Sequence, residues 1–288
     1  MVRILKTEEW FHRDGFPITV ERRDPQEPFG LHAHEFMELV IVTGGHGLHV
    51  TGRESWPLGA GDVFVISTGR PHNYEGMDKL SLINILFQPK RLHMDFQDLT
   101  ALPGYHALFT LEPAWRKRHR FKSRLHLSLA ELGHVLGLVD QLDAELKSRA
   151  PGFGFMATAT FMQMIGFLSR CYERSRNPDS KSLLRIAQAI THLETNLDRD
   201  TKLDDLAKIA GMSKRSFLRA FQAATNKSPI AYLIQLRVNR AASLLRRGNE
   251  TITDIAFRVG FSDSNYFTRQ FRKIFDTSPK AYRRKHGS

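Results

Sequence analysis

The sequence contains a single cysteine, Cys171, among its 288 residues. One cysteine cannot form an intrachain disulfide, which excludes a disulfide scaffold and fits a reducing compartment. The N-terminal segment has no apolar signal core, and no apolar run approaches the roughly 20 residues that a membrane-spanning helix needs. Phosphate-binding glycine loops, dinucleotide fingerprints and nucleophile motifs are also missing. These absences predict a cytoplasmic protein that has no membrane segment and needs no cofactor.

Positive charge is distributed unevenly along the chain, which has a formal net charge of +12. Residues 181–288 contain 21 Lys and Arg but only 9 Asp and Glu, whereas residues 1–180 contain 21 of each. A basic segment joined to a neutral one is typical of a polyanion-binding domain attached to a partner domain. With 41% hydrophobic and 25% charged residues, the chain suits about two globular domains.

One supersecondary unit is written twice in the basic segment. The first copy reads LDDLAKIAGMSKRSFLRAF from Leu203, and the second reads ITDIAFRVGFSDSNYFTRQF from Ile252. In each copy six further residues lead to a second motif, SPIAY or SPKAY. The first halves align at an offset of 49 and the second halves at 50, so the second copy contains one extra residue. Two copies are too few for a stacked solenoid.

Each copy predicts two helices joined by a tight turn. Gly211 and Gly260 suit the positive φ of such a turn, and Ser213 and Ser262 are candidate N-caps of the second helix. This is the pattern of a helix-turn-helix, whose second helix enters the DNA major groove. The two predicted units span residues 203–222 and 252–273.

The second helix of each copy has a polar face opposite its aromatic face. At 100° per residue the phenylalanines point inward, and a set of Arg, Asn, Gln, Leu and Thr residues points outward. A solvated helix face would look similar. The equivalent positions in both copies favour base reading, because Arg pairs with guanine and Asn with adenine. The predicted DNA-binding residues are Arg215, Leu218, Arg219, Gln222, Asn265, Thr268, Arg269 and Arg272.

These paired motifs resemble the AraC/XylS family of bacterial transcription regulators over about residues 182–284. In that family a long helix joins the two units, and residues 230–246 fit it, with Gly248 to end it. The resemblance implies a DNA-binding domain at residues 183–288. Residues 175–182 are polar and are predicted to be the linker, with Pro178 as a helix breaker.

The first 88 residues show short apolar runs separated by glycine and proline clusters, which predicts a small β-sandwich or barrel. HAHEFME at residues 32–38, followed by Gly45, and GDVFVISTGRPH at residues 61–72 resemble the two motifs of the cupin barrel. The resemblance implies a cupin-like sensing domain, which we assign to residues 1–110. The run HAHEFMELVIVTGGHGLHV also resembles rhamnose-operon activators within the AraC family, which implies a sugar-like effector.

In metal-binding cupins the matching positions are ligands. In this chain they are His32, His34, Glu38 and His72. Even spacing places the first three on one strand face, and three imidazoles with a carboxylate suit a divalent transition metal. Ser67 and Gly76 depart from the motif, which has proline and asparagine there. We therefore expect these four side chains to form a polar effector pocket without metal, and a metal site is the less favoured alternative.

Residues 111–174 are predicted to be a helical element. Its first helix has apolar residues at three-or-four spacing, and the second spans residues 156–172. The element resembles the dimerisation helices of the family, although helices packed back onto the barrel would show the same pattern. The apolar positions of the first helix are Leu129, Leu132, Leu136, Val139, Leu142 and Leu146.

The sequence thus predicts an α+β protein of two domains: a β-barrel with a helical dimer element, and an all-α domain with two helix-turn-helix units. The expected function is a homodimeric transcription regulator that binds double-stranded DNA and a small polar effector, and contacts RNA polymerase if it is an activator. The alternative is a cupin metalloenzyme with an appended helical domain. An enzyme gives no reason for the duplicated unit and its basic charge, so we expect no enzyme.

Overall fold

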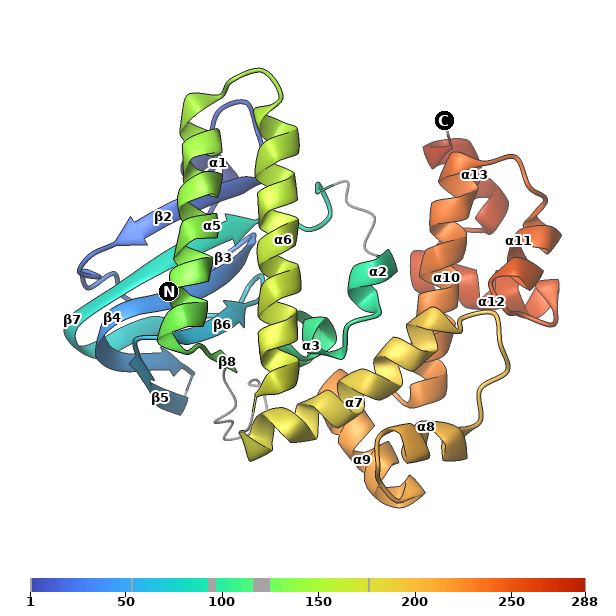
Figure 1. Cartoon of the computed structure of the whole chain (residues 1–288). Helices are drawn as coiled ribbons and strands as arrows, with labels where there is room; N and C mark the ends of the chain where they lie inside the picture. The colour runs from blue at the N-terminus through green and yellow to red at the C-terminus, as the bar shows by residue number, and fades with distance from the viewer. Residues whose placement is uncertain (1, 53, 93–96, 116–124, 176, 288) are drawn as a thin grey trace. The chain divides into compact units, whose positions relative to one another are not determined.

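The computed structural model describes residues 2–52, 54–92, 97–115, 125–175 and 177–287 (Figure 1). The chain divides into two compact units, Met1–Leu184 and Arg185–Ser288. The N-terminal unit is rich in β-sheet and the C-terminal unit is helical (Figure 1), which confirms the predicted α+β fold class. Among the described helices, none is long and apolar enough to cross a bilayer.

A six-stranded sheet forms the N-terminal unit. Its strand order is β2-β7-β4-β6-β8, with β5 paired to β4, and a separate parallel pair joins β1 to β3. The strands are β1 (Arg3–Leu5), β2 (Ile18–Arg23), β3 (His32–His34), β4 (Met37–Thr51), β5 (Glu54–Gly59), β6 (Asp62–Ile66), β7 (Asn73–Phe87) and β8 (Leu125–His126).

The two long strands β4 and β7 pair along most of their length and are interrupted at Gly44–His46. Gly45 has a φ of 64°, and a Cβ placed on it would lie 2.0 Å from the Lys79 carbonyl oxygen, so only glycine fits this irregularity. One face of the sheet is closed by a buried apolar cluster. This cluster contains Val40, Val42, Trp56, Leu58, Phe64, Ile66, Leu80 and Leu82.

The stretch 32–38 differs from the single strand that its alternation predicts. β3 pairs with β1 and β4 pairs with β6 and β7, so the chain changes partners at Glu35 and Phe36. Glu35 is held by an ion pair with Lys6 at 2.5 Å, and Phe36 is buried beside Leu86. The bend serves two sheets at once, which alternation alone does not reveal.

Short helices and one long hairpin complete this unit. The short ones are α1 (Thr7–Trp10), α2 (Gln97–Thr100), α3 (Pro103–Tyr105), the π-helical turn η1 (His106–Leu111) and α4 (Glu112–Trp115). The hairpin consists of α5 (Leu129–Ser148) and α6 (Phe153–Arg174). Ser128 and Glu131 form a capping box that fixes the start of α5.

The apolar stripe predicted on α5 divides between two faces. Leu132 and Val139 are buried, whereas Leu129 is 88% exposed and Leu136 is half-buried. The cause is packing against β2, where Arg22 lies 2.7 Å from Asp140 of α5. Helices packed on the sheet were the alternative reading of this pattern, and the buried face fits it.

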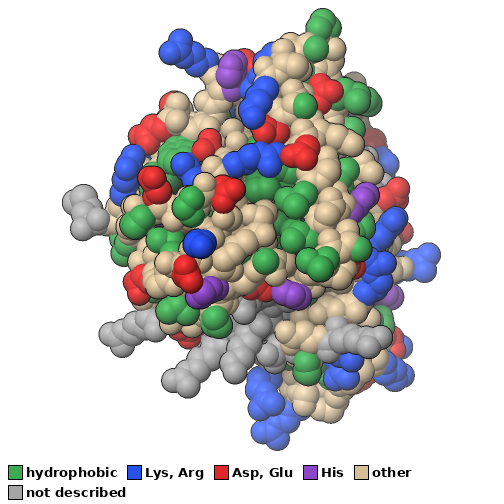
Figure 2. Space-filling model, turned by 60° about the vertical axis from the view of Figure 1, so that its left-hand side comes forward, with side chains coloured by type: hydrophobic (Ala, Val, Ile, Leu, Met, Phe, Trp, Pro, Cys, Tyr) green, Lys and Arg blue, Asp and Glu red, His purple; other side chains and the backbone are tan. Residues whose placement is uncertain are grey.

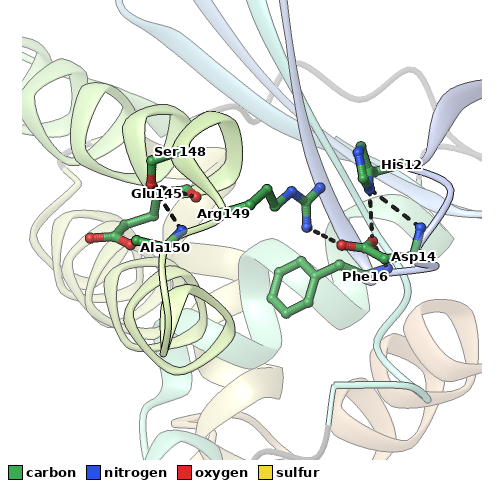
Figure 3. A network of polar contacts seen from close by, with 7 residues as sticks. All are labelled: His12, Asp14, Phe16, Glu145, Ser148, Arg149 and Ala150. Carbon is green, nitrogen blue, oxygen red and sulfur yellow. Dashed lines mark hydrogen bonds and ion pairs between the residues drawn. The ribbon is translucent and has the colours of Figure 1, made fainter.

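The turn between α5 and α6 is fastened to the loop before β2 (Figure 3). Arg149 ends α5 in a left-handed conformation, and its guanidinium lies 2.8 Å from Asp14 Oδ2. The same guanidinium lies over the Phe153 ring, 4.5 Å from its centroid. Asp14 also accepts a hydrogen bond from the backbone N–H of Phe16 at 2.9 Å. These contacts fix the far end of the hairpin to the sheet.

The C-terminal unit contains the two copies of the repeated unit and the helix between them. Its helices are α7 (Pro178–Thr195), α8 (Leu203–Ile209), α9 (Lys214–Thr225), α10 (Pro229–Arg247), α11 (Ile252–Arg258), α12 (Ser264–Phe275) and α13 (Pro279–His286). α10 ends at Gly248, as the sequence predicts. Pro178 begins α7 and breaks no helix there, because proline is tolerated in the first turn, where its missing N–H has no intrahelical partner. The second half of the predicted linker is therefore helical.

Surface charge is mixed on the side of the molecule that Figure 2 brings forward. Basic and acidic side chains lie near one another over the central part of this face, with hydrophobic side chains between them. Such a surface produces no strong field of one sign. This agrees with the equal numbers of acidic and basic residues in residues 1–180.

Candidate effector pocket and DNA-reading helices

A pocket of about 450 Å³, partly open to solvent, lies in the N-terminal unit between the ends of several strands. Trp10, Phe29, Phe36 and Leu86 give it apolar walls. Its size is within the usual range for small-molecule sites, which combine apolar walls with a few convergent polar groups. The polar lining consists of Glu21, Arg23, Gln26, His32, His34, Glu38, Tyr74 and Asn84.

The four residues that the sequence singles out meet at this pocket. Glu38 Oε2 lies 3.0 Å from His34 Nε2 and 3.5 Å from His72 Nε2. The rings of His32 and His72 lie with centroids 4.2 Å apart, because these two residues form an isolated β-bridge. All four are buried, with between 0% and 7% of their surface exposed.

Each of three imidazoles hydrogen-bonds a backbone carbonyl through Nδ1. The pairs are His32 with Gly30 at 2.9 Å, His34 with Phe36 at 2.6 Å and His72 with Arg70 at 3.1 Å. A carbonyl oxygen only accepts, so Nδ1 carries the proton in each ring. The carbonyls thus fix both the tautomer and the orientation of the imidazoles.

The electrostatics of the cluster follow from its burial. Burial alone would raise the pKa of Glu38, but His34 and His72 beside it hold that pKa well below the usual range of a glutamic acid. Burial and the neighbouring His72 lower the pKa of His32 to about 4. Glu38 is therefore a carboxylate and His32 a neutral imidazole at neutral pH.

The opposite wall of the pocket was not predicted from the sequence. Glu21 and Arg23 of β2 lie 3.1 Å apart, and Asn84 of β7 faces Glu21 in the strand register. Arg23 also lies over the Trp10 ring, 5.7 Å from its centroid. Charged residues at alternate positions of a strand could have indicated Glu21 and Arg23. Only the pairing of β2 with β7 brings in Asn84.

Strand β2 contacts the pocket on one side and the helical hairpin on the other. Glu21 and Arg23 line the pocket, whereas Arg22 between them pairs with Asp140 at 2.7 Å and Asp143 at 3.2 Å. Alternation along a strand explains this, since neighbouring side chains point to opposite faces. A shift of β2 would therefore reach α5 directly.

In the C-terminal unit the two helix-turn-helix copies match in length and capping. α8 and α11 each have 7 residues, and α9 and α12 each have 12. Ser213 caps α9 by accepting from the Ser216 N–H, as predicted. The prediction of Ser262 for α12 was wrong, since Asp263 accepts from the N–H groups of Asn265 and Tyr266. The extra residue of the second copy therefore precedes this cap.

The predicted DNA-reading positions lie on the outer faces of α9 and α12. Phe217 and Phe221 of α9, and Phe267 and Phe271 of α12, are fully buried behind them. Leu218 and Thr268 are half-buried. The exposed members of the two sets are Arg215, Arg219, Gln222, Asn265, Arg269 and Arg272.

Comparison with known families matches both units. A helix-turn-helix domain model matches residues 206–285, and an AraC-like ligand binding domain model matches residues 17–151. The HTH-type transcriptional activator RhaR of Mannheimia succiniciproducens is 32% identical over 279 residues, covering 97% of this chain and 96% of that protein. The RhaR protein of Escherichia coli K12 is also 32% identical, over 283 residues, covering 98% and 96%.

Solved structures similar to this chain carry the same kinds of description. The DNA-binding domain of AdpA in complex with a target DNA is 31% identical, covers 35% of this chain and 91% of that chain, and has a TM-score of 0.34. ToxT of Vibrio cholerae is 14% identical, covers 93% and 97%, and has a TM-score of 0.37.

Proposed function

The chain belongs to the AraC/XylS family of DNA-binding transcription regulators, and from this premise we propose that a small polyhydroxylated effector occupies the pocket and changes the affinity for DNA. The observation that carries the proposal is the arrangement of polar groups in the pocket. Neutral imidazole offers one donor and one acceptor, and a carboxylate accepts two hydroxyl groups. Arg23, Asn84 and Glu21 supply further groups from the opposite wall, and Trp10 gives an apolar face. This combination suits a sugar.

Strand β2 is the proposed route from the pocket to the DNA-binding unit. An effector that contacts Glu21 and Arg23 would displace β2, and the ion pairs of Arg22 would pass that displacement to α5. The hairpin of α5 and α6 continues in sequence towards α7, which begins at Pro178. Coupling of this kind between two sites is typically worth about 1–3 kcal/mol.

We expect Glu38→Gln to blunt the response to effector and to leave effector-free DNA binding intact. Effector should shift operator affinity of the unchanged protein about 5- to 150-fold, and the variant should show a smaller shift because its amide accepts fewer hydroxyl bonds. Calorimetry with a panel of hexoses, deoxyhexoses and pentoses, followed by operator binding with and without each sugar, measures both parts. A Glu38→Gln protein that answers its effector normally would place the pocket elsewhere.

Homodimer formation through the hairpin is part of the proposal. The face of α5 turned away from β2 carries Leu129 and Leu136. On α6, Phe155, Ala159 and Met162 form an exposed stripe at helical spacing, and Phe155 is 78% exposed. Exposed apolar side chains in such a row are typical of an interface between protein chains.

Charges placed on this stripe should convert a dimer to a monomer. Leu136→Glu and Phe155→Glu would each desolvate a carboxylate in the interface, which costs far more than the apolar contact it replaces. Sedimentation velocity at tens of micromolar measures the change. Gln141→Glu adds the same charge at an exposed position on another side of α5 and should stay dimeric. A wild-type protein that sediments as a monomer would refute the dimer.

The remaining partners follow from the family. The relatives are named transcriptional activators, which supports contact with RNA polymerase and a cytoplasmic location for this chain. The metalloenzyme alternative receives no support from the comparisons, since both family models and the relatives describe regulators.

A further inference from the structure

Two buried imidazole nitrogens point at an acceptor without forming a hydrogen bond. Nε2 of His34 and Nε2 of His72 are both inaccessible to solvent and have no hydrogen-bond partner. Both lie close to the same atom, Oε2 of Glu38, at 3.0 and 3.5 Å. Because Nδ1 of each ring carries its proton toward a carbonyl, a neutral ring presents a lone pair at Nε2.

No arrangement of protons satisfies this cluster well. With both rings neutral, two nitrogen lone pairs and a carboxylate face one another as three acceptors. With both rings charged, two cations and one anion share a fully buried site, and the extra positive charge is uncompensated. A cation between the three atoms would accept all of the lone pairs at once.

We propose that His34, Glu38 and His72 bind one divalent transition-metal ion at the base of the pocket. Their ligand atoms all lie within 4.8 Å of one another. Two ligand atoms that each lie about 2.1 Å from one zinc-like ion are about 3.0–3.4 Å apart, close to the 3.0 and 3.5 Å found here. The backbone carbonyls on Nδ1 of both rings are the outer-shell partners that metal-bound histidines usually have.

This site has three protein ligands. His32 does not join the group of ligand atoms, although its ring is stacked near His72. Two imidazoles and one carboxylate suit Zn²⁺, Ni²⁺, Co²⁺ or Fe²⁺, and they leave coordination positions toward the pocket. We infer that hydroxyl groups of the effector fill these positions, and this part rests on the proposed function. The sequence favoured a pocket without metal, and the orientation of the imidazoles reverses that preference.

The test is a titration of full-length, chelator-stripped protein with cobalt chloride. We expect one Co²⁺ per chain, with visible ligand-field absorption and a higher Tm. His72→Gln and Glu38→Gln should each weaken binding at least about 100-fold, more than the loss of an outer partner costs. His32→Gln, and His46→Gln at an exposed site, should retain one Co²⁺ within a few-fold of the original affinity. Absence of binding in the wild type, or equal loss in His32→Gln, would overturn the three-ligand site.

Two further measurements keep the outcome decisive. If a ligand variant fails to fold, pulsed electron paramagnetic resonance of the Cu²⁺-loaded wild type counts the coordinated imidazoles, and any number other than two contradicts the proposal. Arg23→Ala removes a pocket residue that is no metal ligand, so it should weaken the sugar response and keep the bound cobalt. Bound metal without a sugar response would refute the proposed effector only, and a sugar response without bound metal would refute the metal site only.

Discussion

Phe271→Ala should remove about 3–5 kcal/mol from the free energy of unfolding of the C-terminal unit, the usual cost of truncating a fully buried phenylalanine. The ring is 0% exposed and packs against Phe267, Phe275 and Tyr282, with centroids between 4.9 and 5.7 Å apart. In a unit of about 100 residues, such a loss lowers Tm by roughly 12–40 °C. Differential scanning calorimetry of the full chain measures the change.

Phe257→Ala is the matched control for this prediction. Phe257 lies on α11 of the same repeat copy but is 52% exposed, so its truncation should cost less than about 1 kcal/mol. The equivalent change in the first copy, Phe221→Ala, should cost as much as Phe271→Ala, because Phe221 is also fully buried. Equal losses from Phe257→Ala and Phe271→Ala would mean that burial does not govern the stability of this unit.

The helical unit could be predicted from the sequence almost completely, and the reason is the local nature of its rules. Helix period, turn glycines and caps act over a few residues, so the positions of α9 and α12 follow from the pattern. The one wrong cap shows the limit of this approach. Ser262 and Asp263 are neighbours that are both good N-caps, and the inserted residue decides between them.

The pocket could be predicted only in part because half of it depends on strand pairing. His32, His34 and Glu38 lie within seven residues, so alternation indicated that they meet even though the chain bends between β3 and β4. Glu21 and Asn84 come together only through the register of β2 on β7. Register between distant strands is set by the whole sheet, and one sequence does not encode it locally.

The direction of the imidazoles is the other feature beyond the reach of the sequence. Its residues indicated a cluster of histidines and a carboxylate, which serves a sugar or a metal equally well. The carbonyls of Phe36 and Arg70 decide which ring nitrogen faces Glu38. Backbone acceptors of this kind depend on the conformation of two turns, and side-chain identity says nothing about them.

Replacing Arg215 and Arg269 together should weaken operator binding about 30-fold to 10⁴-fold. Each arginine that contacts a base pair bidentately contributes about 1–3 kcal/mol, and the two losses should add because they lie on separate reading helices. Both side chains are exposed, and Arg269 is held over the Tyr266 ring with its guanidinium carbon 5.7 Å from the centroid. The two helices would read successive major-groove segments about 34 Å apart.

Single substitutions tested on altered operators distinguish base reading from charge. Arg215→Lys and Arg269→Lys keep the charge but lose the planar fork, so each should relax specificity at one base position. Arg247→Ala removes one exposed positive charge from α10, outside both reading helices, and should weaken every sequence alike if it contacts DNA at all. If Arg215→Ala and Arg269→Ala behave like Arg247→Ala, losing affinity uniformly across base-substituted operators, these arginines bind phosphates. Base recognition would then fall to the remaining side chains on the same faces, of which Asn265 and Gln222 could pair with adenine.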